Sequence, residues 1–141
     1  MKEYCDGIAR VRGAGGIAGT VMLKQLPEGV MVTAVISGLP ESETGFFALH
    51  IHEGGSCGGG DFGESGSHYN PEGRKHPLHA GDLPLLLRCG GKAHLQVLTD
   101  RFRAEDVIGR TVVIHSDPDD YRSQPAGNAG KKIACGIICR F

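Results

Sequence analysis

Short apolar segments separated by turn residues dominate the chain, and helical periodicity is scarce. Apolar residues that alternate with polar ones predict strands with one buried face. In the segment from Val30 to Ser37, for example, Val32, Ala34 and Ile36 fall on one face of a strand. The expected strands are Ile17–Leu23, Val30–Ser37, Phe46–His52, Ala93–Leu98, Thr111–His115 and Ile133–Ile138, with weaker candidates near the N-terminus and at Leu85–Leu87.

This pattern predicts an all-β fold, a Greek-key β-barrel or sandwich of about eight antiparallel strands. Two segments, 53–84 and 116–131, are much longer than turns. Loops longer than about 12–15 residues in a compact domain are usually functional or disordered. Function is favoured for the first, because it holds three of the seven histidines. Neither a linker nor a repeat interrupts the pattern, so residues 1–141 are expected to form a single domain.

The composition narrows the choice of function. Lys and Arg number 15 and Asp and Glu number 16, which gives a formal net charge of −1, whereas a general nucleic-acid binder would carry a basic excess. No apolar run approaches the roughly 20 residues that span a bilayer. The first ten residues, MKEYCDGIAR, carry charges where a signal peptide needs an apolar stretch. We therefore expect a cytoplasmic protein that binds neither nucleic acid nor membrane, and whose five cysteines are by default reduced thiols.

His50 and His52 are the first candidates for metal ligands. They alternate with Phe47, Leu49 and Ile51 in an expected strand, so both imidazoles leave the strand on the face opposite the apolar side chains. Two nitrogen donors on one face, two residues apart, can bind the same metal ion. A His-x-His pair by itself is a weak signal, and an incidental surface pair is the alternative.

The long segment 53–84 adds a denser cluster of ligands. It holds His68, His76, His79 and Asp82 within 15 residues. Three imidazoles and one carboxylate complete a tetrahedral zinc shell without a thiolate. Pro77 stiffens the turn that would bring His76 and His79 together. The alternative, a solvated polar loop with scattered histidines, is less consistent with this density.

His115 closes an expected strand and extends the first pair of histidines. With that pair and His68 it would supply four nitrogens, a set that suits tetragonal Cu(II). Both sets of ligands then need His68. An imidazole that loses both ring protons can bind two cations through its two nitrogens, so the shared residue implies a bimetallic site. His94, the seventh histidine, shares a strand face with polar Gln96 and is expected to face solvent.

These histidines lie in segments that resemble the copper–zinc superoxide dismutase family. The resemblance runs in order from about Gly38 to Ile137, while the N-terminal third matches only in its strand pattern. Several separate motifs in the right order are a much stronger signal than any one of them. The matching segments are Leu49–Glu53, Gly66–Pro71, His79–Leu83, Ile108–His115, Gly127–Gly130 and Ala134–Gly136.

The resemblance implies two ligand sets that share His68 as a bridge. The copper ligands would be His50, His52, His68 and His115. The zinc ligands would be His68, His76, His79 and Asp82. It also implies that Asp119 links a copper-site histidine to a zinc-site histidine, and such partners fix the orientation of a ligand. Finally, it implies that Cys57 and Cys135 form a disulfide, with two buried thiols as the alternative. The cysteines expected to stay free are Cys5, Cys89 and Cys139.

The activity implied by the resemblance is the disproportionation of superoxide to dioxygen and hydrogen peroxide. Copper would alternate between Cu(II) and Cu(I), His68 would take up and deliver a proton, and zinc would hold His68 without redox chemistry of its own. Lys132 stands where the family has an arginine close to the copper. A lysine keeps the charge that attracts the superoxide anion but lacks the planar guanidinium, so slower or less selective capture is expected. An ordinary surface charge is the alternative for Lys132.

Two further features bear on the assignment. The loops after His52, after His76 and after His115 are shorter than in eukaryotic members of the family and resemble those of bacterial members. The oligomeric state therefore stays open, with a homodimer of unknown interface as one outcome. A non-catalytic protein of the same fold, which stores or delivers copper or zinc, is the alternative function. Retention of all four implied copper ligands favours the enzyme.

Overall fold

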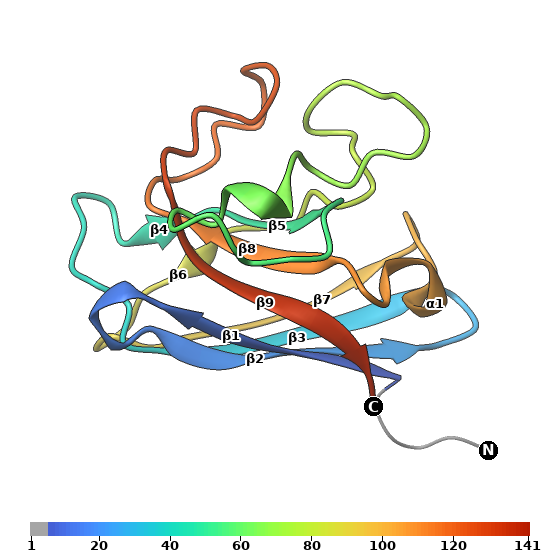
Figure 1. Cartoon of the computed structure of the whole chain (residues 1–141), viewed down its shortest axis with the longest axis horizontal. Coiled ribbons are helices and arrows are strands. Elements are labelled where there is room, and N and C mark those ends of the chain that lie inside the picture. The colour runs from blue at the N-terminus through green and yellow to red at the C-terminus, as the bar shows by residue number, and fades with distance from the viewer. Residues whose placement is uncertain (1–5) are drawn as a thin grey trace.

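A strongly curled antiparallel sheet forms most of the protein (Figure 1). The computed structural model describes residues 6–141. Seven strands form the main sheet in the order β5-β8-β9-β1-β2-β3-β7, and β4 pairs with β6. The prediction of an all-β barrel of about eight antiparallel strands is confirmed. The strands are β1 Gly7–Gly13, β2 Ala18–Gln25, β3 Val30–Ser37, β4 Phe46–Phe47, β5 Leu49–His52, β6 Leu86–Leu87, β7 Ala93–Thr99, β8 Thr111–His115 and β9 Lys132–Arg140.

Helical structure is limited to short turns in the described part of the chain. One α-helix, α1, covers Ala104–Val107, and two 3-10 turns cover Ala14–Gly16 and Gly63–Ser65. None of these helices has the length or the apolar character needed to cross a membrane.

The expected strand Phe46–His52 is divided in two, which is the main difference from the sequence prediction. Ala48 interrupts it because its backbone bonds elsewhere: its N–H donates to Asp117 O and its carbonyl accepts from His115 N. β4 then pairs with β6, whereas β5 pairs with β8. The alternation of side chains survives the break, because Phe47, Leu49 and Ile51 all lie in the hydrophobic core. The weak candidates near the N-terminus and at Leu85–Leu87 are strands β1 and β6.

β5 is buried on both faces, and this explains the position of the site. Leu49 and Ile51 pack into the core inside the curled sheet, while His50 and His52 leave on the opposite face. The two long loops, 53–84 and 116–131, rise from β5 and β8 on that side (Figure 1). As a result the two histidines are as deeply buried as the core, with 0% and 2% of their surface exposed.

Candidate metal centre

Six histidines and two aspartates are buried together between β5, β8 and the two long loops. Their exposed fractions lie between 0% and 7%, which is unusual for polar side chains. β5 supplies two of the histidines, the end of β8 supplies one, and the loops supply the remainder. These buried residues are His50, His52, His68, His76, His79, His115, Asp82 and Asp119.

One group of four histidines has its ligand nitrogens within 4.8 Å of one another. The group consists of His50, His52, His68 and His115. Strand alternation places the first two, and a β-bridge between the backbones of His52 and His68 brings in the loop residue. The Nε2 atoms of His52 and His115 lie 3.1 Å apart, and the rings of His50 and His68 are stacked with centroids 3.9 Å apart.

In three of these rings, one nitrogen makes a hydrogen bond to a carbonyl or carboxylate oxygen, and the other nitrogen has no such oxygen partner. His52 Nδ1 donates to Gly66 O at 2.7 Å, and His115 Nδ1 donates to Gly130 O at 3.4 Å. His50 uses Nε2 instead, which lies 2.7 Å from Asp119 Oδ2. These partners fix the tautomers, so the free nitrogens of the three rings face the middle of the group.

Two buried nitrogens in this group have no hydrogen-bond partner at all. They are Nδ1 of His50 and Nε2 of His68. A buried polar atom without a partner costs free energy, and native proteins contain few of them. A lone pair that points at a metal ion removes the cost, so a nitrogen-bound metal such as copper fits this group.

A second group joins His68 to three ligands from the same loop, His76, His79 and Asp82. His68 Nδ1 lies 2.9 Å from Asp82 Oδ1 and 3.2 Å from His79 Nδ1. His76 Nδ1 lies 3.2 Å from Asp82 Oδ2 without a hydrogen bond. Ligand atoms at the corners of a tetrahedron around zinc stand about 3.3 Å apart when the bonds are about 2.0–2.1 Å. The spacing and the donor set therefore fit zinc.

Asp119 connects the two groups from loop 116–131. Its carboxylate oxygens lie 2.7 Å from His50 Nε2 and 2.7 Å from His76 Nε2, and Tyr121 N donates to it as well. Burial alone would raise the pKa of Asp119, but the hydrogen bonds from the two histidines hold the pKa well below its usual range. Gly127 packs against this contact at φ +73°, where a Cβ atom would collide with the carboxylate and the His76 ring. The carboxylate is therefore a fixed anion that orients one histidine of each group.

Burial keeps three imidazoles of the copper-type group, His50, His52 and His115, neutral over a wide pH range. Together with the neighbouring imidazoles, it lowers the pKa of His52 to about 2 and the pKa of His115 to about 3. It also lowers the pKa of His50, despite the opposing effect of Asp119. A metal ion does not bind a protonated imidazole nitrogen. These histidines are thus ready to bind metal ions without first releasing a proton.

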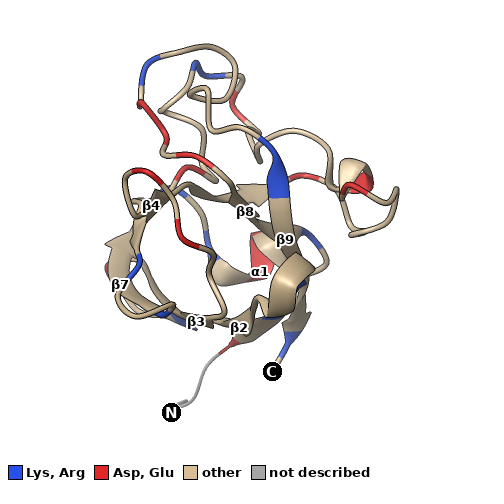
Figure 2. Cartoon of the chain, turned by 90° about the vertical axis from the view of Figure 1, so that its left-hand side faces the viewer, with Lys and Arg blue, Asp and Glu red and all other residues tan. Residues whose placement is uncertain are grey.

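Lys132, at the start of β9, forms part of the wall of a cleft of about 520 Å³ that opens over His52, His68 and His115. Figure 2 shows this end of β9 in blue, beside the segment that carries the 3-10 turn Gly63–Ser65. The ammonium donates to Ser65 Oγ and Gly66 O, both at 2.8 Å. The structure thus places a cation in the wall of the cleft.

The disulfide between Cys57 and Cys135 is present, so the alternative of two thiols is wrong. It ties the loop that carries the zinc-type ligands to β9. Cys89 and Cys139 are free and exposed, as expected, and Cys5 lies outside the described residues.

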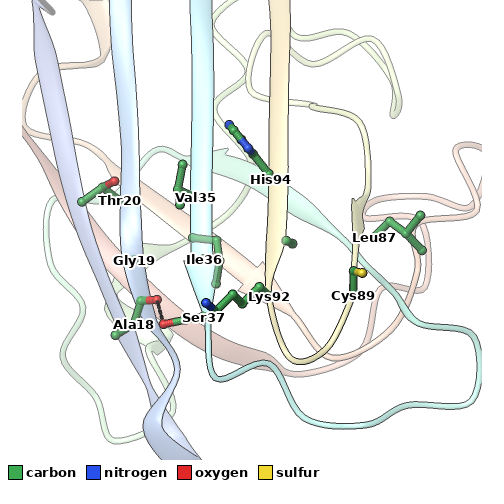
Figure 3. A pocket seen from close by; sticks show the side chains of 11 residues that line it. Ala18, Gly19, Thr20, Val35, Ile36, Ser37, Leu87, Cys89, Lys92 and His94 are labelled. Atoms are coloured by element: carbon green, nitrogen blue, oxygen red, sulfur yellow. Dashed lines mark hydrogen bonds between the residues drawn. The ribbon is translucent and has the colours of Figure 1, made fainter.

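The described residues contain no group of metal ligands away from this centre. His94 is exposed, as expected from its strand face. It lines an open hollow of about 800 Å³ over β2, β3 and β7, together with Cys89 and Lys92 (Figure 3). The three side chains do not converge there, and His94 points away from Cys89 in Figure 3.

Several residues of the centre were missed by the sequence reasoning. Gln124 bonds to the backbone of His76, Arg101 bonds to the carbonyls of Pro77 and His79, and Ser65 accepts from Lys132. A single glutamine, arginine or serine in a loop carries no periodicity or spacing that marks it. No signal in the sequence alone would have found them.

Comparison with known proteins gives a consistent result. The family model described as copper/zinc superoxide dismutase (SODC) matches residues 17–138. Superoxide dismutase [Cu-Zn] 2 of Aquifex aeolicus is 39% identical over 139 residues, which cover 88% of this chain and 80% of that one. The copper chaperone for superoxide dismutase of Mus musculus is 35% identical over 154 residues, 99% of this chain and 55% of that one. The solved structure of the Cu/Zn superoxide dismutase from Brucella abortus superposes with a TM-score of 0.79 at 26% identity, covering 94% of this chain and 99% of that one.

Proposed function

The chain belongs to the copper/zinc superoxide dismutase family and disproportionates superoxide to dioxygen and hydrogen peroxide, and from this premise we propose how its residues divide the work. The group His50, His52, His68 and His115 holds copper. The group His68, His76, His79 and Asp82 holds zinc. A single observation carries this assignment: His68 has Nδ1 within 2.9 Å of Asp82, whereas its buried Nε2 has no hydrogen-bond partner and belongs to the other group.

Copper supplies a one-electron couple when it is bound, and zinc supplies charge and fixed geometry without redox chemistry. Two protons are consumed for each hydrogen peroxide formed, one from His68 and one from water. His68 lines the cleft, and its Nε2 has no partner within the protein. When this nitrogen is not bound to copper, it can instead hold a proton and donate it to the reduced oxygen species in the cleft. Asp119 keeps His50 in a single orientation throughout.

The proposed role of Lys132 is to attract superoxide to the cleft. Its ammonium is held at the wall by Ser65 and Gly66 and places a positive charge beside the copper ligands. A charge in a cleft raises the rate of capture of a small anion, and salt screens this effect.

Lys132→Ala is expected to lower kcat/KM by about tenfold at low ionic strength, with a smaller difference at high salt. Lys132→Arg keeps the charge and adds the planar guanidinium, so a rate at least equal to that of the parent is expected. The measurement is the rate of superoxide dismutation against ionic strength at matched copper content. Lys92→Ala, which removes a charge from the distant hollow, is the control. A Lys132→Ala enzyme with the rate and salt dependence of the parent would exclude steering by this residue.

Stepwise metal loading tests the assignment of function. Metal-free protein, protein loaded with zinc alone and protein loaded with zinc and then copper are compared in one dismutation assay. Activity is expected only after copper is added. The active protein is expected to contain one copper and one zinc ion per chain. Absence of activity despite both metals would contradict the proposed division of residues.

The similarity to a copper chaperone supports a second candidate, delivery of copper to another protein. Experiments on the same copper-loaded protein distinguish a delivery protein from an enzyme. A delivery protein would lose copper rapidly to a competing chelator and show little turnover, whereas an enzyme retains copper through many turnovers. The buried ligands of this centre favour retention.

A further inference from the structure

The side chain of Gln124 joins the two long loops at one of the proposed zinc ligands. The backbone N–H of His76 donates to its Oε1 at 2.9 Å, and its Nε2 donates to the carbonyl of His76 at 2.7 Å. The amide thus pairs with both polar groups of the His76 backbone. The same Nε2 also donates to the Arg122 carbonyl, which fixes the side chain within its own loop.

The ring of His76 is held from the same loop. Asp119 accepts from its Nε2 at 2.7 Å, so loop 116–131 contacts this residue at its backbone and at its ring. The ring contact sets the direction of the imidazole, and the backbone contact sets its position. In this arrangement Nδ1 lies 3.2 Å from Asp82 Oδ2 and has no hydrogen-bond partner.

Arg101, which follows β7, holds the next residues from another segment. Its Nη1 donates to the carbonyl of Pro77 at 2.7 Å and to that of His79 at 3.2 Å. The backbone of the segment from His76 to His79 is therefore held by two side chains that come from outside loop 53–84, Gln124 and Arg101. The two contacts share no atoms, and Gln124 is the one that belongs to the loop of Asp119.

We propose that Gln124 is a positioning residue for zinc: it docks loop 116–131 onto His76 and slows the local opening through which zinc is released. This inference rests on the proposed assignment of zinc to His68, His76, His79 and Asp82. Loops outside the core open by local unfolding, at a free-energy cost set by their few hydrogen bonds. Removal of the amide leaves the buried core of the sheet intact, so its effect is confined to this opening.

The test compares Gln124→Ala and Gln124→Glu with the parent, each fully loaded with zinc. Zinc release into excess chelator is expected to be on the order of tenfold faster in the alanine variant, which loses both hydrogen bonds to His76 and the one to Arg122. Glutamate has the same shape as glutamine, but it places a carboxylate oxygen, which cannot donate a hydrogen bond, beside the carbonyl oxygen of His76. Zinc release from Gln124→Glu is therefore expected to be at least as fast as from Gln124→Ala. Gln96→Ala, an exposed glutamine on β7, is the matched control and is expected to release zinc like the parent.

Two further readouts separate positioning from a general loss of stability. Urea unfolding of the metal-free proteins is expected to coincide for the parent and all variants. With Co(II) as the probe in place of zinc, the visible bands of the tetrahedral ion are expected to change in both Gln124 variants. Parent-like release from both variants, or faster release matched by an equal loss of metal-free stability, would overturn the inference. If the parent itself releases zinc as fast as His76→Ala, it is instead the ligand assignment that fails.

Discussion

His68→Ala is expected to abolish superoxide dismutation and to remove tight zinc binding at the same time. The reason is that His68 belongs to both ligand groups, with Nδ1 near Asp82 and His79 and with Nε2 in the copper-type group. Loss of a partner that merely orients a ligand weakens metal binding about 10–100-fold, and loss of the ligand itself is expected to exceed this. His50→Ala removes a ligand of one group only, so it is expected to lose activity and copper while it retains zinc.

The measurement is metal content after dialysis, together with the dismutation rate, for the two variants and the parent. His94→Ala is the matched control, because this histidine is exposed on β7 and lies outside the centre. It is expected to keep both metals and full activity. Retention of zinc by His68→Ala at the level of the parent would show that this residue does not bridge two metal sites.

Removal of the disulfide in a Cys57→Ser, Cys135→Ser double variant is expected to destabilise the metal-free protein by about 4.5 kcal/mol. The two cysteines are 78 residues apart, so the cross-link closes a long loop and strongly restricts the unfolded chain. The disulfide also fastens loop 53–84 to β9, and we expect the variant to lose metals more readily. The effect is measured as the free energy of unfolding in urea, in the absence of metals.

Cys89→Ser is the control for the double variant, because Cys89 is a free and exposed cysteine. It is expected to unfold at the same urea concentration as the parent. If the double variant also unfolds there, the cross-link contributes nothing to stability and the loop is held by its other contacts. The hydrogen bonds of Lys132 to Ser65 and Gly66, which also join this loop to β9, would then be among those contacts.

The sequence by itself determined the strands and the face from which the ligands leave. Alternation is a local property: once the residues around Leu49 and Ile51 are extended, His50 and His52 must point to the other side. Local alternation also predicted β3 correctly, and its bounds, Val30–Ser37, are the same in the prediction and in the structure. The density of histidines after residue 67, together with the family resemblance, indicated which loop residues to consider as ligands.

Only the tertiary structure decided which nitrogen of each ring is free. That choice depends on carbonyls and carboxylates far along the chain: Gly66 for His52, and Asp119 for His50. It also decided the break at Ala48, because the competing partners of its backbone, Asp117 and His115, come from distant segments.

The contact of Gln124 with His76 was also decided by the tertiary structure alone, since it spans 48 residues and follows no sequence pattern in either loop. Periodicity and spacing record local geometry, and a hydrogen bond between two loops exists only after the sheet has brought both loops to one side. The sequence could therefore indicate the candidate ligands of the metal centre, whereas the residues that hold those side chains in place were set by the packing of segments that lie far apart in the chain.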